Sequence, residues 1–116
     1  MILVRQDLCP TLISSDSTIE QVWVRLSLGD RSLYIGGAYI PPRSEVVVYS
    51  RLVESCAVVA DQLKDLDEMM LVCDLNLPEI GWREDDEHPC TYLPMNISSE
   101  AEMITIDGLL DLGLGN

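Results

Sequence analysis

Two side chains that can handle a proton or a phosphate follow one short apolar run in this sequence. Asp74 and Asn76 come directly after residues 69–73, a run with the length of a strand. Residues two apart in an extended segment point to the same side, so we expect the carboxylate and the carboxamide to project together from the strand's carboxyl end. An acceptor beside a donor suits a water to be deprotonated, a metal ion or a phosphate oxygen. The alternative is a turn, because Asp and Asn also hydrogen-bond their own backbone.

A tyrosine ends a second apolar segment. Tyr39 precedes Ile40 and the rigid pair Pro41-Pro42, so its hydroxyl is a candidate phosphate contact. The alternative is a ring that packs on the core. Gly36 and Gly37, inside the same segment, indicate a bulge or a close backbone approach rather than a phosphate cradle.

The strands that must position these residues are visible as hydrophobic patterns. Residues 22–28 alternate with a period of two, and the turn signal 29–31 leads into a second strand at 33–40, which predicts a β-hairpin. The run 69–73 does not alternate, which predicts a strand buried on both faces. Residues 2–5 are predicted to form a short strand, and the stretch from there to residue 17 is predicted to be a loop.

Two helices are expected between and after these strands. Ser44 is a candidate N-cap for the first, whose apolar stripe comprises Tyr49, Leu52, Val53, Cys56, Val59, Ala60 and Leu63. Residues 99–102 form a capping box that begins the second, which is expected to stop at Gly113. Between the last strand and this helix, residues 83–97 are predicted to be an acidic loop, with His88 exposed. This order of elements indicates an α/β or α+β fold.

Composition narrows the functional classes. The 116 residues carry 20 acidic and 7 basic side chains, for a net charge of −13, and 47% of them are hydrophobic. Such a chain is expected to fold rather than to be disordered. It has no apolar run of membrane-spanning length and no cleavable leader, so we expect an intracellular protein, nuclear or cytoplasmic, that is not secreted. The acidic balance disfavours nucleic-acid binding, because phosphate backbones are repelled.

The four cysteines are predicted to be reduced thiols. Cys9, Cys56, Cys73 and Cys90 contain no Cys-x-x-Cys pair and, with one histidine, form no recognisable zinc pattern.

Taken together, the two chemical motifs resemble a known family. Residues 33–43 and 71–82 look like blocks of the endonuclease/exonuclease/phosphatase family, and more narrowly of the endonuclease domain of non-LTR (LINE-type) retrotransposons. In that family the second block usually reads Gly-Asp-Phe-Asn-Leu-Pro, with a tryptophan a few residues later. Residues 20–24 and 109–114 also fit. The resemblance implies a DNase I-like, four-layer α/β sandwich, of which residues 1–116 would form a single partial domain, incomplete at both ends.

The resemblance also implies roles for the three candidate residues. Asp74 resembles the aspartate that orients or deprotonates the attacking water, and Asn76 resembles the asparagine that holds this aspartate and the phosphate. Tyr39 resembles the tyrosine at the phosphate. The implied reaction is hydrolysis of a DNA phosphodiester, with Mg²⁺ as the cofactor.

Departures from the family pattern are equally informative. The family's metal-binding glutamate would precede Ile2, and its terminal Ser-Asp-His signature would follow Asn116; neither is present, and His88 is no substitute. Cys73 replaces the usual glycine, and Leu75 the usual phenylalanine. We therefore expect a nuclease fragment that lacks the main metal ligand, is inactive alone and binds DNA weakly.

Two other hypotheses remain open at this stage. One is an acidic protein-interaction module that keeps the nuclease scaffold and uses its surface for partners. The other is a phosphoesterase that acts on a substrate other than nucleic acid.

Overall fold

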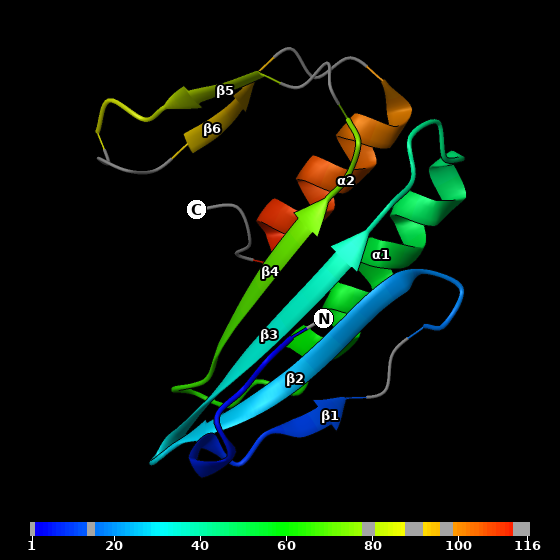
Figure 1. Ribbon diagram of the computed structural model, residues 1–116. Helices are drawn as coiled ribbons and strands as arrows, with labels where there is room; N and C mark the ends of the chain where they lie inside the picture. The colour runs from blue at the N-terminus through cyan, green and yellow to red at the C-terminus, as the bar shows by residue number, and fades with distance from the viewer. Residues whose placement is uncertain (1, 14–15, 78–80, 88–91, 96–98, 113–116) are drawn as a thin grey trace.

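The computed structural model describes residues 2–13, 16–77, 81–87, 92–95 and 99–112. Its elements, in chain order, are η1 (Gln6–Leu8), β1 (Thr11–Ile13), β2 (Glu20–Leu28), β3 (Arg31–Tyr39), α1 (Val46–Ala60), β4 (Glu68–Asp74), β5 (Gly81–Glu84), β6 (Tyr92–Met95) and α2 (Glu100–Asp111). Four strands form one twisted sheet, and both helices lie on the same side of it (Figure 1). This arrangement is a mixed α/β fold, as expected.

The main sheet has the strand order β1-β2-β3-β4. β2 and β3 form the expected hairpin, whose two-residue turn contains Gly29 with a φ of 76°, a conformation that glycine adopts at little cost. β4 pairs with β3 in parallel, and α1 provides the crossover that a parallel pair requires.

The predicted strand at residues 2–5 is wrong. Those residues form no strand, and the edge strand is β1, which pairs with β2 from within the stretch predicted to be a loop. β1 forms a strand because it hydrogen-bonds to the open edge of β2. Its own sequence shows no hydrophobic alternation that would predict a strand, and two of its three residues are exposed.

α1 covers one face of the sheet with most of the expected apolar stripe, but the helix ends at Ala60, so Leu63 packs on the core from beyond it. Tyr49, Leu52, Cys56 and Val59 are buried against Trp23, which is completely buried. The predicted N-cap is wrong by one residue: Glu45 is the N-cap and provides no side-chain hydrogen bond. The Ser44 hydroxyl instead donates to the carbonyl oxygen of Pro41 at 2.6 Å, which keeps it in the preceding turn.

α2 begins where the sequence predicts and packs on α1. Ser99 and Glu102 form the complete capping box. Gly108 faces Val53 so closely that a Cβ at position 108 would overlap the Val53 side chain. Glycine at this point allows the two helix backbones to approach.

The second face of the sheet is only partly covered. The N-terminal segment crosses this face in front of β2 and β3 (Figure 1), and Val24 and Leu26 are buried there. On β4, however, burial alternates, and Met70 and Val72 are 51% and 64% exposed. The prediction that residues 69–73 are buried on both faces is therefore wrong, because both helices lie on one side of the sheet and nothing in the described residues covers β4 on the other.

β5 and β6 form a separate antiparallel hairpin, which projects beyond the end of β4 in Figure 1. Part of the predicted acidic loop 83–97 is thus strand, although its residues 88–91, which include His88, and 96–97 lie outside the described part of the chain. Each of these strands has only four residues, too few for a period of two to be recognised in the sequence. No helix among the described residues has the length and apolar character needed to cross a membrane.

Candidate functional site

Tyr39 and Asp74 lie next to each other at the carboxyl ends of β3 and β4. They are register partners in the parallel pair, so their Cα atoms lie on neighbouring strands roughly 5 Å apart. Gly36 faces the Trp23 ring on the α1 side, and strand alternation therefore places Tyr39 on the opposite face. Asp74 is exposed, and Tyr39 is 39% exposed. The alternative in which the Tyr39 ring packs in the core is wrong.

The Asn76 side chain links the ends of β3 and β4 by a hydrogen bond to the backbone. Its Nδ2 donates to the carbonyl oxygen of Ile40 at 2.7 Å. The backbone of Asn76 has a φ of 48°, in the left-handed region that Asn tolerates better than most residues. Its N–H donates to Oδ1 of Asp74 at 3.1 Å, which is the turn that the sequence left as an alternative.

This turn corrects the expected geometry of Asp74 and Asn76. The extended strand ends at Asp74, so the rule that residues two apart share one side no longer holds at residue 76. The left-handed turn brings the carboxamide back to Ile40 instead of letting it project beside the carboxylate. The two side chains remain neighbours because the backbone N–H of Asn76 bonds to the Asp74 carboxylate.

Tyr49 of α1 holds the turn after β4 in place through a hydrogen bond, a role that the sequence did not predict. Its side chain is 2% exposed in the α1 stripe, and its hydroxyl donates to the carbonyl oxygen of Leu75 at 2.8 Å. Burial raises the pKa of this phenol, so the hydroxyl keeps its proton and stays a donor. This role could have been predicted from the sequence, because a tyrosine within a buried apolar stripe needs a hydrogen-bond partner for its hydroxyl.

Cys73 precedes Asp74 on β4 and is partly buried on the face of the strand opposite to it. Burial, and then the nearby Asp74 carboxylate, raise the pKa of its thiol, which therefore stays protonated at neutral pH. Cys9, Cys56 and Cys73 are all free thiols, as expected. Cys90 lies outside the described residues.

The oxygen donors of the site fit Mg²⁺ in kind. Mg²⁺ prefers oxygen ligands and usually takes one or two from the protein, with water and substrate phosphates completing the octahedron. Asp74 offers a carboxylate, and Oδ1 of Asn76 has no hydrogen-bond donor among the described residues. Within the same part of the chain, no group of three or more His, Cys, Asp or Glu residues is arranged so that it could hold a metal ion by itself.

Comparison with known proteins yields no relatives. No family model matches the chain, and no curated protein or solved structure matches it either.

Proposed function

We propose that this chain is the central part of a retrotransposon-type endonuclease that hydrolyses DNA phosphodiester bonds with the help of a divalent metal. The observation that carries the proposal is the register pairing of Tyr39 with Asp74. This pairing brings two separate sequence blocks together at the carboxyl ends of β3 and β4. Proteins of the α/β class commonly bind their ligands at the carboxyl ends of their strands. The blocks are those that resemble the family.

Each residue has a task that its chemistry allows. The exposed Asp74 carboxylate accepts a proton from, or orients, the attacking water. The Tyr39 hydroxyl donates a hydrogen bond to a phosphate oxygen. Asn76 holds the ends of β3 and β4 together and keeps the Asp74 carboxylate in place through its own backbone N–H. Bound Mg²⁺ would offset the negative charge that develops on the phosphate.

The half-covered sheet fits the same proposal. The family domain contains two sheets face to face, and the face of this sheet that bears Met70 and Val72 is apolar and exposed. A second sheet would cover it. The proposal also keeps the expectation that these 116 residues alone do not cleave DNA, since catalytic residues act as a unit and the family's glutamate and histidine have no counterpart here.

The same exposed face favours a second candidate function. An acidic module that binds a protein partner would present Met70 and Val72 to that partner, and would leave Asp74 with a purely structural role. The two candidates differ in what Asp74 does in the presence of metal and DNA.

The experiment uses Mn²⁺, which broadens the NMR signals of nearby amides. We expect added Mn²⁺ to broaden the signals of residues 39, 40 and 74–76, and to do so more strongly with a short DNA duplex, because phosphates supply further oxygen ligands. Asp74→Asn should abolish this local effect while preserving an acceptor for the Asn76 N–H. Asp65→Asn, which removes one exposed carboxylate elsewhere, is the matched control.

Two results would contradict the nuclease proposal. One is broadening at the strand ends that is equal in Asp74→Asn and Asp65→Asn. The other is the absence of any enhancement by DNA, which is the result that the interaction module predicts.

A further inference from the structure

A hollow of about 550 Å³ lies at the other end of the main sheet. Its origin is a difference in length: α1 spans roughly 22 Å and the strands of the β2–β3 hairpin roughly 30 Å, so the hairpin extends past the end of the helix. The chain then returns through residues 61–67. Arg25 and Tyr34, which are register partners, line the hollow on the hairpin side, and Lys64 and Asp67 line it on the loop side.

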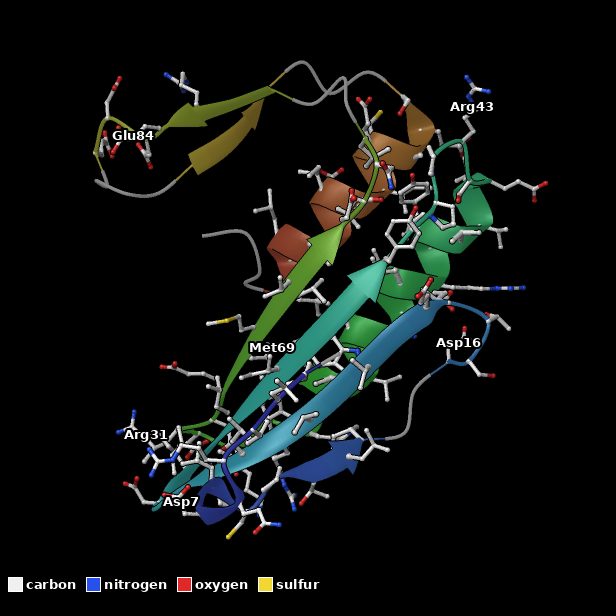
Figure 2. The ribbon with its side chains drawn as sticks, viewed as in Figure 1. Asp7, Asp16, Arg31, Arg43, Met69 and Glu84 are labelled. Carbon is white, nitrogen blue, oxygen red and sulfur yellow. The ribbon has the colours of Figure 1, made fainter. Side chains whose placement is uncertain are left out.

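The hollow has a larger share of basic residues than the rest of this acidic chain. Arg25, Arg31 and Lys64, three of the seven basic residues, line it, whereas only three of the twenty acidic residues do. The local charge therefore balances, although the whole chain has a net charge of −13. In Figure 2, Arg31 marks this end of the sheet and Arg43 the opposite end.

One of the three carboxylates is already committed to the backbone. Asp67 accepts hydrogen bonds from the N–H of Ser32 at 2.7 Å and the N–H of Lys64 at 3.0 Å. These bonds lower the pKa of Asp67 and fasten the loop to the hairpin, so the walls of the hollow are fixed relative to each other.

In the described part of the chain the cations form no close ion pair across the hollow, although Lys64 and Arg25 lie near enough to Asp67 to help lower its pKa. Among the described residues, neither the Arg25 guanidinium nor the Lys64 ammonium forms an ion pair within 4.0 Å, and Arg31 contacts only its neighbour Asp30, at 3.6 Å. Arg25 is half-buried and has therefore lost part of its hydration. A bound anion would replace the hydrogen bonds that this guanidinium has given up.

We propose that this hollow binds the phosphomonoester group of a small molecule. A phosphate dianion suits two or three converging cations better than a single carboxylate does, because it carries more charge and three acceptor oxygens. Ser27 and Ser32 line the hollow and can bond to hydroxyl groups of the ligand. The site lies at the opposite end of β3 from Tyr39 and is independent of the proposed nuclease function.

The test is an NMR titration of the whole chain at fixed ionic strength, with inorganic phosphate and then with ribose 5-phosphate. Amide shifts should be confined to residues 25–34 and 63–67, and affinity should rise from pH 5.5 to 7.5 as the second phosphate charge forms. Lys64→Gln and Arg25→Gln should each weaken binding about tenfold, since each removes one charge-assisted contact. Arg43→Gln removes the same charge far from the hollow and should leave binding unchanged.

Lys64 is exposed, so its variant is expected to fold even if Arg25→Gln does not. Equal phosphate affinity in Lys64→Gln and Arg43→Gln would overturn the proposal, as would the absence of local shifts. Equal binding of acetate or citrate would show a site for carboxylates instead. Shifts that appear only with duplex DNA would also refute a small-molecule site.

Discussion

Asn76 is the residue on which the geometry of the candidate site depends. Its side chain bonds to the carbonyl oxygen of Ile40, just past β3, and its main-chain N–H bonds to Asp74 at the end of β4. Its φ of 48° turns the chain after β4 has ended. The carboxamide thus acts first as a connection between two strand ends. Its Oδ1 remains available to a metal ion, and the second N–H of Nδ2, which the bond to Ile40 does not use, can donate to a phosphate oxygen.

Replacement of Asn76 separates these contributions. Asn76→Ala loses the bond to Ile40 and places a Cβ residue without local compensation in the left-handed region, so we expect a loss of about 2 kcal/mol in unfolding free energy. Asn76→Gly loses the same bond but tolerates the backbone conformation, and should cost about 1 kcal/mol. Urea denaturation measures both values. Equal stability of Asn76→Ala and the unchanged chain would show that the Ile40 bond contributes nothing.

At the scale of elements, the central hairpin is organised around one aromatic ring. Trp23 lies over Gly36 on the neighbouring strand, and a Cβ at position 36 would come within 2.6 Å of three ring atoms. The indole N–H donates to Oε1 of Gln21 at 3.1 Å, which orients the ring along its own strand. The close approach, and not a bulge, explains the first of the two adjacent glycines.

The two glycines provide a matched pair of variants. Gly36→Ala forces the Trp23 ring or the strand to shift, and overpacking of this kind costs about 1–3 kcal/mol. At Gly37 a Cβ would meet Val22 at 3.7 Å, an ordinary contact, so Gly37→Ala should be neutral or slightly stabilising. Thermal unfolding of the two variants checks this order. If Gly37→Ala is the more damaging, the assigned faces of β3 are reversed.

At the scale of the whole molecule, the sheet has one well-covered face and one poorly covered face. Both helices pack on the first, where the core lies. On the second, Met70 and Val72 of β4, which is an edge strand within this sheet, stay exposed. Exposed apolar groups on an edge strand favour association with another chain and lower the stability of the isolated molecule.

We therefore expect the 116-residue chain to unfold below about 60 °C, the upper range of ordinary mesophile domains, or to self-associate. Thermal unfolding recorded with light scattering measures both. Val72→Thr should reduce scattering, whereas Val58→Thr, which changes a similarly exposed valine on α1, should not. A sharp transition of a monomer above 60 °C would contradict this expectation and favour a self-contained module.

The sequence by itself determined the elements whose signals are local. The hairpin turn at Gly29, the apolar stripe of α1 and the capping box at Ser99 all depend on residues a few positions apart, and the structure confirms each of them. The position of Tyr39 and Asp74 at the ends of two apolar segments also came from the sequence, whereas the parallel pairing that makes them neighbours came from the structure. The roles of Tyr39, Asp74 and Asn76 in a reaction stay a proposal.

Only the tertiary structure decided which faces are covered and how the strand ends turn. An apolar run such as 69–73 has the same composition whether one side or both sides are packed, and both helices pack on the same single side. The edge strand β1 exists because β2 offers an open edge, and Asn76 turns because Ile40, 36 residues away, offers a carbonyl oxygen. These features depend on partners distant in the chain, which no local pattern of residues can specify.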